Sequence, residues 1–489
     1  MSEAATVTGT EPLVIDGAEV TGRSLDILNP AKLRETVGAI TVGDSATVDD
    51  AVRAADQAFA GWAAKTAHER AEALTRAAEQ ITAGSAQLSM LLTREHGKIL
   101  ADAGAEIGNT ARTLRYYAGL ADYAEREKVI HDHRGRIIER RVPMGVVAVI
   151  VPWNYPVLLA TLMIAPALIA GNTVVVKLPD HAPLTLARVL RLLAAHVPAG
   201  VVNVVAGSGQ EVGAALTTHP KVRKVSFTGS TATGRAIMRD ASVNLKNLSL
   251  ELGGNDPALV LESAVVDDGL VDGLVRGTFM TSGQVCYAPK RLYVHRRHVD
   301  TFVEAFTAAA RKLVVGDGLD PQVTMGPLNN AQQQRTVADL IDASRAEGAR
   351  VEQVGRFLPP SMSEGHFILP TIVSGLGQDS PLVRKEQFGP AIPILPFDNE
   401  DEAVALANDS EYGLAASVWS QDTEHAFTLA RRLQAGSVFV NVHRVGASDA
   451  SMPFGGFKQS GIGRGHGEIA VDESTEVQVL ADRVDMRST

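Results

Sequence analysis

The stretch GVVAVIVPWNYPVLLATLMIAPALIAGNTVVVK, residues 145–177, decides how this chain folds. Apart from its last residue, Lys177, it has no charged residue, so it resembles a membrane span at first sight. Its three prolines break it into pieces too short to cross a bilayer as one helix. The apolar runs 145–151 and 173–177 predict buried β-strands, and the run 157–170 between them predicts a buried helix.

The same strand–helix alternation continues outward from this stretch. After it come a helical pattern at 183–196, an apolar strand at 201–205 and a strand at 224–228, and a second series begins near Pro257. Alternation of this kind predicts α/β sheets with right-handed crossovers. Residues 49–107 are rich in alanine and carry apolar residues at helical spacing, so they predict helices.

Two segments follow neither series. Residues 133–143 and 474–484 alternate apolar and polar residues like exposed strands. Exposed strand edges tend to be paired. Pairing between subunits and an ordinary edge within one chain both remain open.

Composition narrows the class of protein. The chain has 489 residues, with 46 Lys and Arg against 56 Asp and Glu, which gives a net charge of −10. This balance disfavours nucleic-acid binding through a basic surface. A single cysteine, Cys286, excludes an intrachain disulfide and a cysteine-cluster metal site, and we expect no metal. The N-terminal residues show no secretory signal, so we expect a cytoplasmic location.

Three residues are candidates for chemistry. Cys286 is either a small buried hydrophobic residue or a nucleophile, and Lys290 and Arg291 just downstream favour a thiolate. Glu251, inside an apolar run, is either an ion-paired structural residue or a base whose pKa is raised by burial. Asn154 either stabilises a strand exit or donates to a developing oxyanion.

A glycine turn leads into a predicted helix at Gly229 and Ser230. Free N–H groups and the helix dipole at such a start bind anions such as phosphate. An ordinary capped helix start without a ligand explains the pattern equally well.

Seven motifs occur in order along nearly the whole chain, and together they resemble the aldehyde dehydrogenase superfamily. They are PWNYP (152–156), GNTVVVK (171–177), FTGS (227–230), LELGG (250–254), GQVC (283–286), EQFGP (386–390) and PFGGFKQSG (453–461). The resemblance implies an α/β fold with a Rossmann-like dinucleotide-binding domain, an α/β catalytic domain and a small β-flap that joins subunits into homodimers or homotetramers. The expected bounds are 1–124 and 145–252 for the NAD-binding domain, 253–455 for the catalytic domain, and 125–144 and 468–489 for the flap.

The resemblance also assigns the chemistry. Cys286 matches the nucleophile that forms a thiohemiacetal and then a thioester, Asn154 with the Cys286 N–H matches the oxyanion hole, and Glu251 matches the base that activates water. A coenzyme A-acylating relative generally lacks the glutamate, so Glu251 favours hydrolysis to the free acid. A cysteine hydrolase or a non-catalytic protein on the same fold are the alternatives from other classes.

The cofactor that the resemblance implies is NAD. Its expected contacts are Trp153, Lys177, Asp180, Gly229, Ser230, Glu386 and Phe388. An acidic residue near the ribose 2′-hydroxyl repels a 2′-phosphate, so Asp180 favours NAD over NADP, although NADP use remains possible.

The chain departs from many relatives at two positions on the expected proton path from Glu251. Met163 stands where they carry a lysine, and Gly465 where they carry a glutamate. His466 is a substitute by position, but a solvated loop histidine is the simpler interpretation.

The positions expected to line the substrate tunnel are mostly apolar: Tyr155, Leu158, Leu159, Leu162, Met280, Val285 and Tyr287. Relatives that act on semialdehyde acids carry arginines at the positions of Leu162 and Met280, so we expect an aromatic or medium-chain aliphatic aldehyde as substrate. The alternative is a semialdehyde or other polar aldehyde, with Arg444 at the tunnel mouth near His443 and Asp449.

Overall fold

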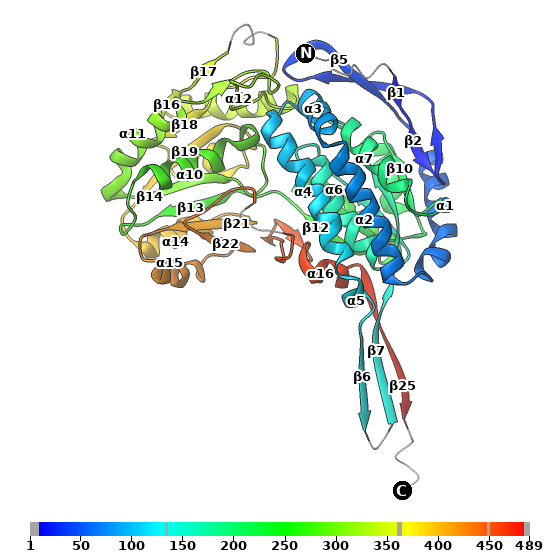
Figure 1. Cartoon of the computed structure of the whole chain (residues 1–489). Coiled ribbons are helices and arrows are strands. Elements are labelled where there is room, and N and C mark those ends of the chain that lie inside the picture. The colour runs from blue at the N-terminus through cyan, green and yellow to red at the C-terminus, as the bar shows by residue number, and fades with distance from the viewer. Residues whose placement is uncertain (1–8, 133–134, 359–363, 447–449, 484–489) are drawn as a thin grey trace.

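The computed structural model shows two lobes, each built around a mainly parallel β-sheet, and a long three-stranded arm (Figure 1). It describes residues 9–132, 135–358, 364–446 and 450–483. The α/β class expected from the sequence is confirmed.

The first lobe contains an eight-stranded sheet in the order β24-β12-β11-β8-β9-β10-β2-β3. The five strands from β12 to β10 run parallel, and β24 (Gly461–Ile462) and β2 (Leu13–Ile15) pair antiparallel at the two sides. The parallel strands are β8 (Val146–Ile150), β9 (Thr173–Lys177), β10 (Val202–Val205), β11 (Val222–Thr228) and β12 (Asn247–Glu251). The chain runs from β8 to β9 and β10 on one side and then crosses back to β11 on the other. In open α/β sheets, sites form at the carboxyl ends of the strands where the order reverses in this way.

The uncharged stretch forms the centre of this lobe. All residues of β8 and β9 are buried, and helix α6 (Pro156–Ile169) connects them. Pro156 stands in the first turn of α6, where its missing N–H costs nothing, whereas Pro166 lies inside the helix. These elements agree with the prediction from the sequence.

Helices cover both faces of the first sheet (Figure 1). The predicted helical region contains α1, α2, α3 and part of α4, and the core beneath is packed with alanine, valine and leucine. The helices are α1 (Ser45–Ala63), α2 (Ala67–Ala83), α3 (Ser85–His96), α4 (Leu100–Ala118), α7 (Leu184–Ala194), α8 (Ala214–Thr218) and α9 (Thr231–Ala241). A short π-helical turn, η1 (Gly209–Gly213), precedes α8.

The N-terminal strands were not predicted. Residues 10–41 form β1 to β5, of which β2 (Leu13–Ile15) and β3 (Ala18–Val20) make a hairpin. The Asp16–Gly17 turn has positive φ at both residues, 54° and 74°, as a tight hairpin requires. The Asp-Gly pair between these two short segments is the feature of the sequence that could have predicted the hairpin.

The second lobe contains a seven-stranded sheet in the order β16-β18-β19-β14-β13-β21-β22. At one edge, β16 (Arg350–Gln353) pairs antiparallel with β18. The other six strands are parallel: β18 (Thr371–Ser374), β19 (Ala391–Phe397), β14 (Pro289–His295), β13 (Asp256–Val260), β21 (Ala415–Trp419) and β22 (Ser437–Val440). Helices that pack on it include α10 (Asp268–Phe279), α11 (Val299–Ala310), α12 (Ala331–Ala346), α14 (Glu400–Asn408) and α15 (Thr423–Ala430).

The two alternating segments pair with each other. Strand β7 (Gly135–Pro143) lies between β6 (Glu127–Asp132) and β25 (Thr475–Arg483), both antiparallel to it. The three strands project away from the first lobe as an arm (Figure 1).

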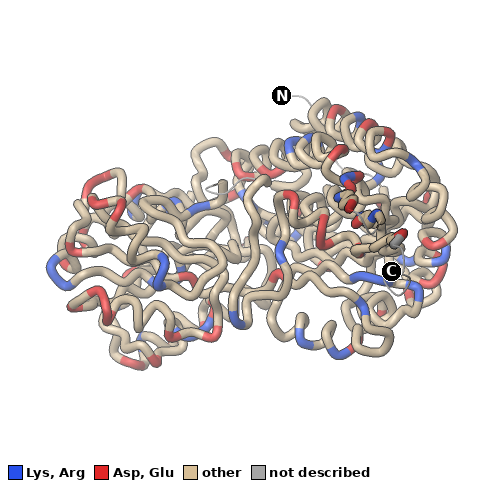
Figure 2. The backbone as a smooth tube through the Cα atoms, turned by 90° about the horizontal axis from the view of Figure 1, so that it is seen from below, with Lys and Arg blue, Asp and Glu red and all other residues tan. Residues whose placement is uncertain are grey.

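Acidic and basic residues are interspersed over both lobes (Figure 2). Among the helices of the described residues, none is both long and apolar enough to cross a membrane.

Candidate active site

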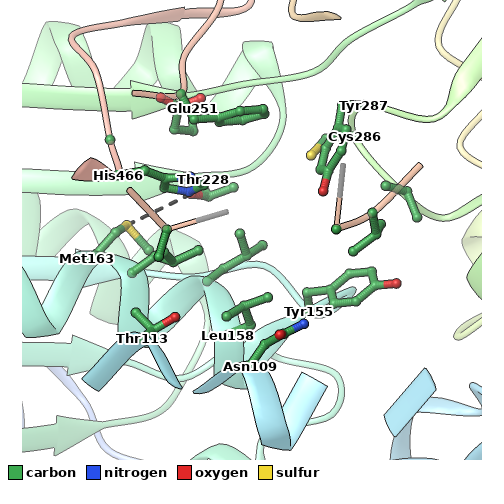
Figure 3. Close-up of a pocket in the computed structure, with 18 of the residues that line it drawn as sticks. Asn109, Thr113, Tyr155, Leu158, Met163, Thr228, Glu251, Cys286, Tyr287 and His466 are labelled. Carbon is green, nitrogen blue, oxygen red and sulfur yellow. Dashed lines mark hydrogen bonds between the residues drawn. The ribbon is translucent and has the colours of Figure 1, made fainter. Parts of the chain in front are cut away.

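A cavity of about 540 Å³ brings together the three candidate catalytic residues. Asn154, Glu251 and Cys286 all line it, although they come from three separate parts of the sequence. Asn154 precedes α6, Glu251 is the last residue of β12, and Cys286 lies in the loop before β14. In Figure 3, Glu251 and Cys286 lie on opposite sides of the cavity.

The loop that carries Cys286 is held in an unusual conformation. Thr281, Ser282 and Gly283 all have positive φ, at 49°, 59° and 74°. A Cβ atom on Gly283 would lie 2.5 Å from the carbonyl oxygen of Gly389, so only glycine fits at that position. The Thr281 hydroxyl also lies 2.8 Å from the Tyr155 hydroxyl, which ties the loop to α6. Local strain fixed by tertiary contacts is typical of active sites.

Cys286 is half-buried, and its surroundings act on the thiol in opposite directions. Burial raises the pKa of the Cys286 thiol to about 12, and the positive charge of Lys290 opposes this effect. Of the two cations expected near the thiol, only Lys290 contributes. Arg291 is buried and donates instead to the backbone carbonyls of Asn255 and Ala407.

Asn154 is buried, and its side chain points to the nucleophile loop. Its Nδ2 donates to the backbone carbonyl of Gln284 at 3.0 Å. The backbone carbonyl of Asn154 accepts a 2.7 Å hydrogen bond from Lys98, which forms a 2.5 Å ion pair with Glu106. Both side chains of this pair are fully buried.

Glu106 connects the pair to helix α6. Its Oε1 accepts hydrogen bonds from the backbone N–H groups of Val157 and Leu158, at 2.9 and 3.2 Å. The ammonium of Lys98 also lies 3.8 Å from the ring centre of Tyr155. Sequence reasoning missed Lys98 and Glu106. Their spacing of eight residues across a helix start carries no recognised signal.

Glu251 has an unsatisfied carboxyl oxygen. Its Oε2 is inaccessible and has no hydrogen-bond partner among the described residues. Burial raises the pKa of Glu251 well above its usual range, and the charge of Arg464 and the backbone of Gly465 oppose this only in part. Once ionised, a carboxylate with a raised pKa is a stronger base toward a water molecule than an exposed glutamate.

His466 is not a solvated loop histidine, so that interpretation was wrong. It is half-buried, lines the cavity and stacks on Phe454 with ring centres 5.1 Å apart. Burial lowers the pKa of His466 to about 4, so the ring is neutral at physiological pH. Met163 lies nearby, where its sulfur accepts a weak 3.9 Å hydrogen bond from Thr228 (Figure 3).

The remaining walls of the cavity are mostly apolar and aromatic. They include six of the seven predicted tunnel residues: Tyr155, Leu158, Leu159, Leu162, Val285 and Tyr287. The seventh, Met280, does not line the cavity, because it lies at the kink between α10 and the left-handed residues that follow.

The arginine at the cavity differs from the one expected. Arg112, an exposed residue of α4, lines the cavity, whereas Arg444 is not among the lining residues, which include Val445. His443 is buried beside Asp256, with 3.7 Å between Nε2 and Oδ2. Asp449 lies outside the described residues.

A second and larger cleft, of about 870 Å³, opens at the carboxyl ends of β8 and β9. Trp153, Lys177 and Asp180 line it, and Lys177 Nζ lies 2.9 Å from Asp180 Oδ1. The first turn of α9 contributes Thr233 to the same cleft. A dinucleotide fits this cleft. The volume is large enough, Lys177 and Asp180 can bind a ribose, and the start of α9 can bind a phosphate.

Four predicted cofactor residues lie outside the lining of this cleft. Ser230 is the N-cap of α9 and accepts a 3.2 Å hydrogen bond from the Thr233 N–H, and Gly229 precedes it. Phe388 has a φ of 49° and contacts the Trp153 ring edge-on at 5.5 Å. Glu386 lies beside Lys290, 3.5 Å from its Nζ.

In the part of the chain that the structure describes, no cluster of three or more His, Cys, Asp or Glu side chains is arranged to hold a metal.

Comparison with known proteins agrees with this architecture. The profile of the aldehyde dehydrogenase family matches residues 18–480. Aldehyde dehydrogenase 1A1 from Oryctolagus cuniculus is 37% identical over 476 residues, which covers 96% of this chain and 95% of the relative. Among solved structures, the NAD+ complex of an aldehyde dehydrogenase from Bacillus cereus superposes with a TM-score of 0.93 at 35% identity, covering 98% of both chains. Betaine aldehyde dehydrogenase from Staphylococcus aureus, in complex with NAD+, gives a TM-score of 0.94 at 32% identity, covering 99% of this chain and 97% of that one. The chain therefore belongs to the aldehyde dehydrogenase family.

Proposed function

We propose that the protein oxidises an aldehyde to the free carboxylic acid with NAD, through covalent intermediates on Cys286. The observation that carries this proposal is the cavity in which Cys286, Asn154 and Glu251 meet, beside a cleft that fits a dinucleotide. The membership of the family and its NAD-bound relatives support the same activity.

In this mechanism each residue has one task. The Cys286 thiolate attacks the aldehyde carbon, and one N–H of the Asn154 amide stabilises the oxyanion that forms. The cleft lined by Trp153, Lys177 and Asp180 would hold NAD, which would supply the hydride acceptor that turns the thiohemiacetal on Cys286 into a thioester. Glu251 then takes a proton from water, which attacks the thioester and releases the acid.

The preference for NAD over NADP rests on Asp180. Its carboxylate lines the cleft and pairs with Lys177, so it offers a hydrogen-bond acceptor to a ribose 2′-hydroxyl and repels a 2′-phosphate. We therefore expect a lower KM for NAD than for NADP. A lower KM for NADP would contradict this assignment.

The substrate that the cavity fits best is an aromatic or medium-chain aliphatic aldehyde. Its walls near Cys286 are apolar, and Leu162 lies where a cation would be needed for a short semialdehyde acid. A carboxylate buried there without a partner would cost several kcal/mol, on the order of the usual penalty for an unpaired buried charge.

A second candidate is an aldehyde with an anionic group at its far end. Arg112 favours it, because this exposed guanidinium lines the cavity and its hydrogen-bond partner in the structure is the Asn109 amide rather than a carboxylate. Steady-state kinetics with benzaldehyde, hexanal and succinate semialdehyde, in wild type and Arg112→Ala, separate the two candidates. A preference for succinate semialdehyde that is lost in R112A supports the second and overturns the first.

Aldehyde-dependent NADH formation, with and without coenzyme A, tests the activity itself. We expect activity without coenzyme A, and its loss in Cys286→Ala. A requirement for coenzyme A would show an acylating enzyme, and unchanged activity in C286A would remove Cys286 from the mechanism.

We also propose that the two sheets mark the functional domains, with cofactor binding on the first lobe and catalysis on the second. The expected boundary at residue 252 falls between β12 and β13, where the chain passes from one sheet to the other. We assign the arm to the expected flap, of which residues 133–134 and 484–489 lie outside the described residues.

A further inference from the structure

Lys290 is a buried cation directly behind the nucleophile. The residue is 3% exposed, and its Nζ donates to the backbone carbonyl of Val285 at 2.8 Å and to that of Cys286. The same Nζ lies 3.5 Å from a carboxylate oxygen of Glu386. An ammonium has three N–H donors, so these contacts account for all of them.

This position is specific to Lys290. The pairing of β14 with β13 shifts register at Lys290, which lies between the paired residues Pro289 and Arg291, and Arg291 is held by other backbone carbonyls. A lysine that donates to two carbonyls of the nucleophile loop fixes that loop. The positive charge of Lys290 also favours the thiolate form of Cys286.

The other charged groups near Cys286 act against the thiolate. Burial and the carboxylates of Glu386, Asp256 and Glu251 raise the pKa of the Cys286 thiol, and Lys290 is the group that lowers it. The Asp256 carboxylate accepts a 3.1 Å hydrogen bond from the Ala415 N–H. The other titratable groups at the cavity are Tyr155, Tyr287, Tyr116, Arg112 and His466.

Glu386 is placed beside Lys290 by the local backbone. It accepts a 3.2 Å hydrogen bond from the Gly254 N–H. A Cβ atom on Gly253 would lie 2.5 Å from Glu386 Oε2, so glycine at 253 is what lets the carboxylate approach. While Glu386 stays there, it neutralises part of the charge that Lys290 offers to the thiolate.

We propose that Lys290 is a positioning residue that fixes the Cys286 loop and stabilises the thiolate, and that Glu386 limits this stabilisation while it is paired with Lys290. The proposal rests on the proposed function in one respect: if the terminal ribose of the cofactor binds Glu386, that contact withdraws the carboxylate from Lys290. Binding of the cofactor then increases the reactivity of Cys286.

Alkylation by iodoacetamide tests the electrostatic part without any turnover. Cys286 is the only cysteine, so the incorporation of one label per chain, followed by mass spectrometry between pH 7 and 10, reports on this thiol alone. We compare Lys290→Met, Lys290→Arg and Glu386→Gln with wild type. Lys221→Met, which removes an exposed lysine paired with Asp56, is the matched control.

The two key variants should change the rate in opposite directions. A nearby positive charge lowers the pKa of a thiol by about one unit or more, which increases the fraction of thiolate about tenfold. A less basic thiolate is also a weaker nucleophile, and this offsets roughly half of the gain in the logarithm of the alkylation rate. We therefore expect alkylation about threefold slower in K290M, near wild type in K290R and K221M, and about threefold faster in E386Q. Equal rates in K290M and wild type, or changes of the same sign in K290M and E386Q, would overturn the proposal. Should K290M fail to fold, the comparison of E386Q with wild type still decides the question: faster alkylation in E386Q supports the proposal, and an equal rate overturns it.

ADP-ribose tests the link to the cofactor, since it carries the terminal ribose without a nicotinamide to cover the thiol. A rise in thermal midpoint shows that it binds. At saturation it should accelerate alkylation of wild type about threefold and leave E386Q unchanged, whereas AMP, which lacks the terminal ribose, has no such effect. Binding without acceleration in wild type overturns the link, whereas a failure to bind contradicts the proposed dinucleotide site instead.

Discussion

Trp153 and Asn154 are neighbours in the chain, yet Trp153 lines the larger cleft and Asn154 the smaller cavity. The loop between β8 and α6 therefore forms the wall between the two spaces. The Gln284 carbonyl accepts one N–H of the Asn154 amide, and an amide NH2 has a second N–H, which is the donor that we propose for the oxyanion. The wall thus fixes the orientation of the amide that we propose as the oxyanion donor.

The first prediction follows from this second N–H. Asn154→Ala should lower kcat about 100-fold, because one oxyanion donor contributes on the order of 10²–10³ in rate. Asn109→Ala, which removes another amide at the same cavity, is the control and should keep kcat within about threefold. Equal losses in the two variants, measured by steady-state kinetics, would show that the Asn154 amide has no special role.

The second prediction concerns the buried pair of Lys98 and Glu106. Glu106→Ala should destabilise the protein by about 3–5 kcal/mol, because it leaves a fully buried ammonium without its partner and frees the first N–H groups of α6. The double variant Lys98→Met with Glu106→Leu should recover much of this loss. Urea unfolding of wild type and the two variants measures these changes, and a double variant less stable than E106A would contradict the prediction.

The sequence predicted the centre of the fold well because the physical signal there is strong. Buried parallel strands leave uninterrupted apolar runs, and Pro156 marks the start of α6. The N-terminal strands were missed because they are only two to ten residues long and lie beside a helical region. Their Asp-Gly turn was a weaker signal than the alanine-rich periodicity that follows it.

The candidate site was predictable only as far as single residues go. Cys286, Glu251 and Asn154 stand in local patterns with chemical meaning. The burial of His466, the different partners of Lys290 and Arg291, and the environment of the Lys98–Glu106 pair depend on how distant parts of the chain pack together. No local pattern contains that information.

The third prediction is a pH dependence of thioester hydrolysis. Because burial raises the pKa of Glu251, its carboxyl group stays protonated to higher pH than a free glutamate, and the base form appears only as the pH rises. Hydrolysis should therefore speed up with pH, and Glu251→Gln should lose that dependence and about 100-fold in rate. In rapid mixing, E251Q should still give one burst of NADH per chain. The absence of a burst would place Glu251 before the thioester instead.

The fourth prediction is a loss of stability on the acid side from His466. Its pKa is about 4 in the folded state against about 6.5 in an unfolded chain, so the unfolded state binds the proton first as the pH falls. The resulting destabilisation begins below pH 6.5 and is about 1 kcal/mol at pH 5, allowing for solvent around a half-buried ring.

Replacement of His466 by Phe keeps a ring against Phe454 and removes this titration. The thermal midpoint of His466→Phe minus that of wild type should therefore increase as the pH is lowered from 7.5 to 5. A constant difference between the two proteins would show that His466 does not titrate as its burial implies. The same variant also tests a role in hydrolysis, which would appear as slower release of the acid at pH 7.5.

The fifth prediction concerns the arm. Val129 on β6 and Val477 and Val479 on β25 are 56%, 52% and 59% exposed, which is more apolar surface than a projecting sheet should leave to solvent. We therefore expect the arm to pack against a second copy of the chain. Val479→Glu should then lower the mass found by light scattering toward that of one chain, 51.7 kDa, while Val265→Glu, at a 44% exposed valine before α10, should not. Wild-type protein that already runs as a monomer would contradict the prediction, because the exposed valines would then have no partner.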